Sequence, residues 1–145
     1  MTVHLLRVAA GVKSIDHLQE VIARDSFEHK QYGLVMPLTT RNRPKMQDEL
    51  LDGGSVYWIV KNVVLARAPL VGFETFETED GRPIIHIYAR PPMILVEPRP
   101  KRGFQGWRYL KVEEAPADFS GHHYSQSYED MPIEMMTELK ELGLI

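Results

Sequence analysis

The segment from Glu97 to Leu110 holds the residues best suited to binding a charged ligand. It contains four cations and three aromatic residues, which are Arg99, Lys101, Arg102, Arg108, Phe104, Trp107 and Tyr109. Arginine and lysine neutralise phosphate, and flat rings stack on bases. Two prolines and two glycines in the same segment disfavour a helix and a central strand. We expect an ordered surface loop that binds an anionic, stackable ligand, although the rings also suit a structural plug with solvated cations.

The net charge of −3 is unevenly distributed along the chain. Residues 1–96 carry eleven cations and eleven anions, residues 97–111 carry five cations and one anion, and residues 112–145 carry one cation and eight anions. A basic island of +4 therefore precedes an acidic segment of −7. The acidic segment either competes for the basic surface or solvates the end of the fold.

Two further groups of residues could carry chemistry. Tyr57 and Trp58 are neighbours on an expected strand and point to opposite faces, so one ring can lie in the core while the other, Trp58 in our assignment, lines a binding surface. His86 with Glu74 or Glu97 would form an acid–base pair. A histidine in an apolar strand is equally suited to a structural hydrogen bond.

Other catalytic patterns are missing from the chain. It contains no cysteine, which excludes disulfides, thiolate metal sites and cysteine nucleophiles. His122 and His123 lie near Glu129 and Asp130, but adjacent histidines rarely chelate through both rings, and no HExxH helix is present. No serine has nucleophile-elbow spacing and no P-loop occurs. We therefore expect no metal and no cofactor, and we favour a binding protein over an enzyme.

The size and composition predict one globular domain, residues 1–145. The chain is 43% apolar and 26% charged, which is ordinary for a folded domain of 145 residues. The absence of cysteine fits a cytoplasmic location. The apolar run at the N-terminus is too short for a signal peptide core or a membrane span, so we expect no membrane partner.

The periodicity of apolar residues predicts an α+β fold. Helical spacing follows Ser14 and continues to between Arg24 and Lys30, and it recurs at 44–51 and 133–142. Strand patterns occur at 3–9, 34–40, 56–60, 63–65, 70–78, 84–88 and 93–96, with a tight turn that places Asn62 at positive φ. We expect a strongly curved antiparallel or mixed sheet of roughly five to seven strands with about three helices.

Two long motifs carry a resemblance to a known family. The segments from Asp48 to Trp58 and from Arg99 to Leu110 resemble a family of short single-domain bacterial proteins, mainly alphaproteobacterial, whose function is unknown. The resemblance covers essentially the whole chain and implies no activity or catalytic residue. A weaker likeness lies in element order, which is similar to the PUA-like group of small barrels, several of which bind RNA or modified bases; it implies a barrel.

Three functions of different classes follow from these patterns. The one that we favour is an RNA- or nucleotide-binding module, in which the four cations contact phosphate and Trp107 or Phe104 stacks on a base. The alternatives are a small-molecule enzyme built on His86 and a protein-interaction or oligomerisation domain. No pattern identifies the ligand, the pathway or the oligomeric state.

Overall fold

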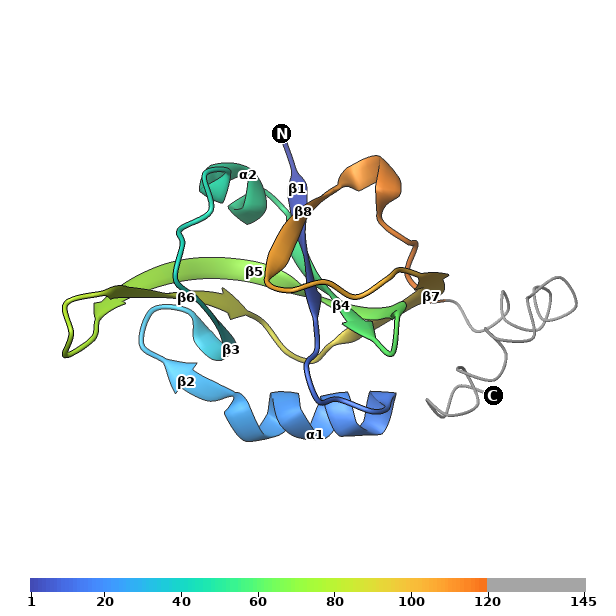
Figure 1. Ribbon diagram of the computed structural model, residues 1–145, viewed down its shortest axis with the longest axis horizontal. Coiled ribbons are helices and arrows are strands. Elements are labelled where there is room, and N and C mark those ends of the chain that lie inside the picture. Colours follow the sequence, from blue (N-terminus) through green and yellow to red (C-terminus); the bar gives the residue numbers. More distant parts are fainter. Residues whose placement is uncertain (120–145) are drawn as a thin grey trace, which may run out of the picture.

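The computed structural model describes residues 1–119, which fold around one long strand (Figure 1). These residues form eight strands, two α-helices and one 3-10 helix: β1 (Val3–Val8), α1 (Ile15–Asp25), β2 (Phe27–His29), β3 (Gly33–Thr40), α2 (Gln47–Leu51), β4 (Ser55–Val60), β5 (Val63–Glu77), β6 (Pro83–Ala89), β7 (Ile94–Pro100), β8 (Trp107–Lys111) and η1 (Val112–Glu114). No helix among the described residues is long and apolar enough to cross a membrane.

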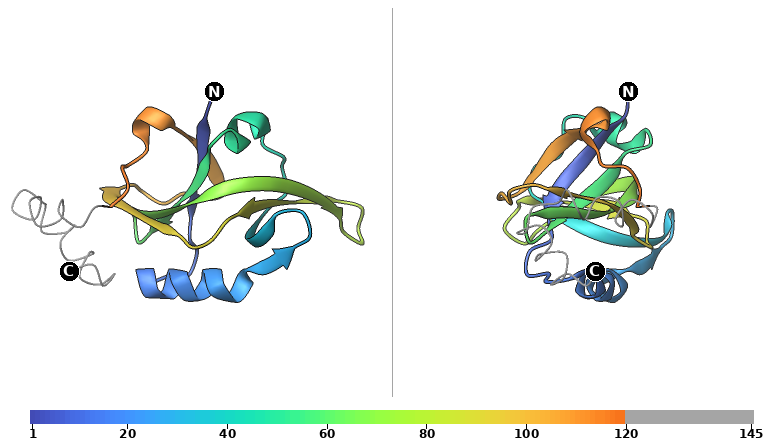
Figure 2. Two further views of the ribbon diagram at one scale, coloured as in Figure 1. Left: turned by 180° about the vertical axis from the view of Figure 1, so that it is seen from behind. Right: turned by 90° about the vertical axis from the view of Figure 1, so that its right-hand side faces the viewer.

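The eight strands form one mixed sheet in the order β2-β3-β6-β5-β4-β1-β8, with β7 paired to β5. Only the β1–β4 pair is parallel among the described strands. The sheet curves strongly, as the end-on view in Figure 2 shows, but it does not close. The predicted curved mixed sheet is confirmed and is accompanied by two α-helices, which is compatible with the predicted α+β class, whereas the described residues form no barrel.

β5 is the longest strand and pairs with three others. One edge pairs with β4, while the other edge pairs with β7 near Val63 and with β6 from Leu70 onwards. Register shifts between Val64 and Ala66 and between Leu70 and Gly72 bend the strand at these two places. The predicted separate pieces at 63–65 and 70–78 are therefore one continuous strand.

The two faces of β1 and β4 bury two different apolar clusters. On one face, Leu5 and Trp58 join the larger cluster, which also contains Leu18 of α1 and Leu50 of α2. On the other face, Leu6, Tyr57 and Ile59 pack with Val96 and Leu110 in a smaller cluster. Side chains alternate between the faces of a strand, so successive residues serve the two clusters.

The helices follow the predicted positions. The Ser14 hydroxyl caps α1 by accepting a hydrogen bond from the backbone N–H of His17 at 3.0 Å. α1 ends at Asp25, within the predicted interval. α2 begins at Gln47, three residues after the predicted start at Pro44. The third predicted helix, at 133–142, lies outside the described residues.

Three strands were missed or truncated by the sequence patterns. β2 and β8 were not predicted, and β7 extends to Pro100 rather than ending at Val96. The expected surface loop from Glu97 to Leu110 is therefore wrong in part, because only 101–106 connects β7 to β8. The strand count consequently exceeds the predicted range. The Lys61–Asn62 turn is confirmed, with φ values of 49° and 65°.

Gly54 joins α2 to β4 where the backbone has no room for a side chain. An added Cβ would lie 2.3 Å from the carbonyl oxygen of Leu50 and 2.4 Å from that of Val3. Both obstacles are backbone atoms, so they cannot rotate away. The Gly54 N–H also donates to the Leu50 carbonyl at 3.0 Å, which ends the helix.

We predict that Gly54→Ala lowers the free energy of unfolding by roughly 2–3 kcal/mol through overpacking. Gly53→Ala is the matched control, because its Cβ would meet only the Thr2 hydroxyl at 3.8 Å. Its positive φ should cost about 1 kcal/mol. Urea unfolding followed by tryptophan fluorescence measures both values. A Gly54→Ala protein as stable as the unmodified one would contradict the close approach.

Candidate functional site

The predicted basic segment forms one edge of the sheet. Arg99 lies at the end of β7, Lys101 and Arg102 lie in the connection, and Arg108 and Lys111 lie on β8. β8 pairs only with β1, so its other edge is unpaired among the described strands. Lys101, Arg102, Arg108 and Lys111 are exposed. Two of the five cations thus lie on an edge strand, where charges are well tolerated, and the other three lie at the end of β7 and in the connection before β8.

These cations are not neutralised within residues 1–119. None of the five forms a salt bridge with a described carboxylate. Arg99 donates instead to the backbone carbonyl of Glu114. Arg99 and Lys101 line a hollow of about 410 Å³, which we call the Arg99 hollow, with Leu6, Val64 and Leu110. Glu113 and Glu114 also line it, so its wall carries both signs of charge.

Two aromatic residues of the segment have structural roles. Trp107 donates from Nε1 to the Thr40 hydroxyl at 3.2 Å and packs against the larger apolar cluster. The Tyr109 hydroxyl accepts the backbone N–H of Met46 at 3.0 Å, and its ring lies edge-on to Trp107 at 5.0 Å. These contacts hold β8 against β3 and the start of α2. Both rings are partly buried, so each offers a ligand only part of its surface.

Phe104 and Arg108 form the remaining planar surface. The Arg108 guanidinium lies 4.3 Å from the centre of the Phe104 ring, a cation–π arrangement. Phe104 is half-buried against the smaller cluster, while Arg108 is exposed. The exposed guanidinium plane can therefore stack on a base in place of Trp107.

Trp58 is almost fully buried and, with residues of β1, β3 and α1, borders a hollow of about 310 Å³. Its side chain is 3% exposed and packs in the larger cluster between the strands and α1. Tyr57, its neighbour, is also buried but faces the smaller cluster. Our assignment of Trp58 to the binding surface gains little support, because both faces of this strand are covered.

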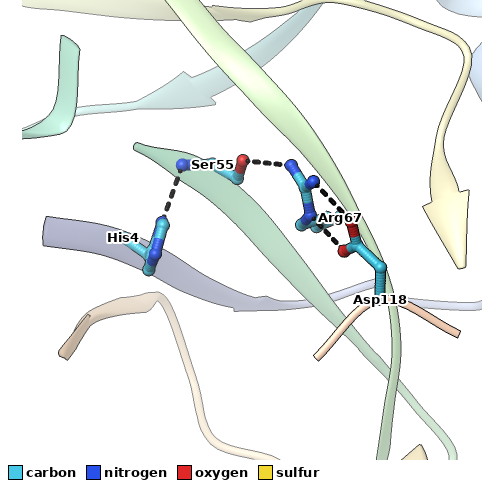
Figure 3. A network of polar contacts seen from close by, with 4 residues as sticks. All are labelled: His4, Ser55, Arg67 and Asp118. Carbon is cyan, nitrogen blue, oxygen red and sulfur yellow. Dashed lines mark hydrogen bonds and ion pairs between the residues drawn. The ribbon is translucent and has the colours of Figure 1, made fainter. Parts of the chain in front are cut away.

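A polar network that the sequence patterns missed crosses the centre of the sheet (Figure 3). Arg67 on β5 donates to both carboxylate oxygens of Asp118, from Nε at 2.8 Å and from Nη2 at 2.9 Å. Its Nη1 donates to the Ser55 hydroxyl at 3.0 Å. The Ser55 N–H in turn donates to Nδ1 of His4 at 3.0 Å. The hydrogen bond from Arg67 lowers the pKa of Asp118, so the pair stays charged.

The network borders an open hollow of about 350 Å³, which we call the Tyr57 hollow. The strands supply His4, Ser55, Tyr57 and Arg67, and the segment 112–118 supplies the opposite wall. The end of this segment is held to β7, since Val96 bridges to Asp118 and the Glu97 N–H donates to the Ala117 carbonyl at 2.8 Å. Burial, then the charge of Arg67, lowers the pKa of His4, which keeps its ring neutral.

Two residues of the predicted acid–base group, Glu74 and His86, lie opposite each other on β5 and β6. Glu97, the alternative partner of His86, lies on β7. The Glu74 carboxylate takes its hydrogen bonds from other groups, namely the Tyr88 hydroxyl at 2.6 Å and His29 Nε2 at 3.2 Å. These two bonds lower the pKa of Glu74. Nδ1 of His86 is enclosed without a hydrogen-bond partner among the described residues.

Fold and site together define a protein with a curved mixed sheet and a basic edge strand. The chain matches the family model described as "Protein of unknown function (DUF1489)" over residues 5–145. It therefore belongs to the DUF1489 family, and the predicted membership of a single-domain family of unknown function is confirmed. No curated protein and no solved structure matches the chain. The histidine pair His122 and His123 lies outside the described residues.

The burial of His4 beside Arg67 predicts a pH dependence of stability. The pKa of His4 is lowered below the 6.5 of an unperturbed histidine. At pH values between this lowered pKa and 6.5, His4 is protonated in the unfolded chain but not in the folded protein. The contribution is therefore complete above pH 6.5 and is lost as the pH falls through this window.

We predict that His4→Asn reduces this pH dependence, because its amide oxygen can accept the Ser55 N–H but does not titrate. Urea unfolding at a series of pH values from about 7 to about 5 compares the two proteins. The free energy of unfolding should fall more steeply with acidification in the unmodified protein. Parallel profiles would mean that folding does not disfavour the protonated ring.

Proposed function

We propose that the protein binds single-stranded RNA or a nucleotide-like anion on its basic edge. One observation carries the proposal: Lys101, Arg102 and Arg108 are exposed beside the Arg99 hollow, and no described carboxylate pairs with them. Several unpaired cations close together in the chain can neutralise neighbouring backbone phosphates. A chain with a net charge of −3 gains nothing in solubility from concentrating its cations there.

The stacking surface in this proposal is the Arg108–Phe104 pair. Trp107 is partly buried against the larger cluster and Trp58 is almost fully buried, so both rings are less exposed than the Arg108 guanidinium. A guanidinium backed by an aromatic ring is planar and positively charged, so it can hold a base and an adjacent phosphate together. A PUA-like barrel, a cytoplasmic location and a bacterial source remain predictions and contribute nothing to this support.

A second candidate function is proton transfer at Glu74. Two observations favour it. The Glu74 side chain is 41% exposed, and its Oε1 accepts hydrogen bonds from both His29 and Tyr88. Burial and the bond to Glu74 raise the pKa of Tyr88, so the hydroxyl keeps its proton. Glu74 would act as a base, with His86 beside it. An interaction or oligomerisation domain stays a prediction that no contact supports.

The RNA proposal predicts a charge-dependent loss of binding. A fluorescently labelled oligonucleotide of about ten uridines is titrated with protein, and anisotropy is measured at about 50 to 200 mM salt. The double variant Lys101→Glu, Arg102→Glu should bind at least about tenfold more weakly. The slope of log affinity against log salt should become shallower by about 0.7 for each phosphate that the variant no longer neutralises.

Lys13→Glu with Lys30→Glu is the matched control, because it makes the same change in net charge at two exposed lysines outside the basic edge. It should retain binding and the salt slope. Circular dichroism confirms that each variant is folded. The proposal is lost if the unmodified protein does not bind at about 50 mM salt, or if both double variants bind equally weakly.

A further inference from the structure

The Tyr57 hydroxyl is a hydrogen-bonding group that the fold buries without using. The side chain is 4% exposed, and no residue among 1–119 forms a hydrogen bond with its hydroxyl. The hydroxyl oxygen is not fully enclosed, and the Tyr57 side chain lines the hollow, so the hydroxyl faces this space. Because Tyr57 lines the hollow and its hydroxyl has no partner among residues 1–119, the hydroxyl is available to donate to a group that binds there.

Two neighbouring residues add donors to the same hollow. His4 accepts the Ser55 N–H at Nδ1, so its neutral ring carries the proton on Nε2. A guanidinium has five N–H groups, and Asp118 and Ser55 occupy three of those of Arg67. The Ser55 hydroxyl accepts from Arg67 and keeps its own proton to donate. The strand side of the hollow is therefore dominated by donors.

The charge balance favours an uncharged ligand group in this hollow. Arg67 is neutralised by Asp118, and His4 accepts the Ser55 N–H as a neutral ring, so this hollow offers a phosphate no unpaired positive charge. Keto oxygens accept hydrogen bonds without a net charge. Val112, Ala115 and Pro116 give the opposite wall an apolar surface, which suits a flat ring.

The two hollows adjoin, because Pro116 lines both. Arg99 and Lys101 lie on one side of this residue, and the Tyr57 hydroxyl lies on the other. A ligand with a flat, keto-bearing group and a phosphate would therefore place each part beside suitable side chains. A nucleotide has both parts.

We propose that the Tyr57 hollow receives a nucleobase with keto oxygens, such as uracil, whose phosphate lies at the Arg99 hollow. This inference rests on the proposed function and adds base selectivity to it. Tyr57, His4 and Arg67 donate to the keto oxygens. Adenine has no keto oxygen and presents an amino donor beside its ring-nitrogen acceptors, so it would pair fewer of these donors than uracil.

Competition with mononucleotides tests the selectivity. The labelled oligouridine is displaced by uridine 5′-monophosphate or by adenosine 5′-monophosphate under the same salt conditions. Uridine monophosphate should compete about five- to tenfold better, as expected for one or two extra hydrogen bonds. Tyr57→Phe keeps the ring and removes the hydroxyl, and it should reduce this ratio to within about twofold.

Two further variants separate the inference from the proposed function. Val112→Glu places a carboxylate at the half-exposed rim of the Tyr57 hollow and should also reduce the ratio, without altering the strands. Lys101→Glu with Arg102→Glu should weaken both competitors equally and preserve the ratio. If RNA binds with the predicted salt dependence but both mononucleotides compete equally, or if Tyr57→Phe keeps the ratio, the inference fails and the proposed function stands.

Discussion

Much of the structure depends on the hydrogen bonding of β5 to three strands. Its first half is flanked by β4 and β7, and its second half by β6, so a single strand connects both parts of the sheet (Figure 1). Arg67 projects from the first half toward the Tyr57 hollow, and Glu74 projects from the second half toward His29 and Tyr88. The position of each polar cluster is thus set by the register of β5 against its neighbours.

The Arg67–Asp118 pair extends this constraint to the chain that follows β8. Asp118 lies beside Val96 of β7, and Phe119 donates its N–H to the Leu95 carbonyl at 2.8 Å. The segment 112–118 is therefore held across the smaller apolar cluster by backbone bonds and by one charge-paired arginine. Because that segment forms a wall of both hollows, the same contacts define the surfaces on which a ligand would rest.

Local patterns predicted the elements that depend on local interactions. Ser14 capping, the stripe of α1 and the Lys61–Asn62 turn are all encoded within a few residues, and all three are confirmed. β7 and β8 could not be recognised in this way. Pro98 lies where the β5–β7 register shifts, so its missing N–H interrupts no regular pairing. β8 is an edge strand that tolerates exposed cations, and its partner β1 lies about a hundred residues earlier.

The sequence predicted those features of the candidate site that depend on residue type alone, and it did not predict those that depend on distant partners. Cations must stay near solvent, so the exposure of Lys101, Arg102 and Arg108 followed from residue type. The role of each aromatic ring depended on distant partners, such as Thr40 for Trp107. The network of His4, Ser55, Arg67 and Asp118 is assembled by the parallel pairing of β1 with β4 and by the return of the chain after β8, and no spacing rule reveals it.

Backbone amide shifts of isotope-labelled protein during titration with oligouridine test the central claim most directly. We predict that the largest changes occur at residues 99–111, which include the basic wall of the Arg99 hollow, and in the segment 112–118, which lines both hollows. Changes confined to the surface around His29, Glu74 and His86 would contradict it and place the ligand on the other half of β5. Changes absent from both regions, at a salt concentration of about 50 mM, would remove the basis for RNA binding.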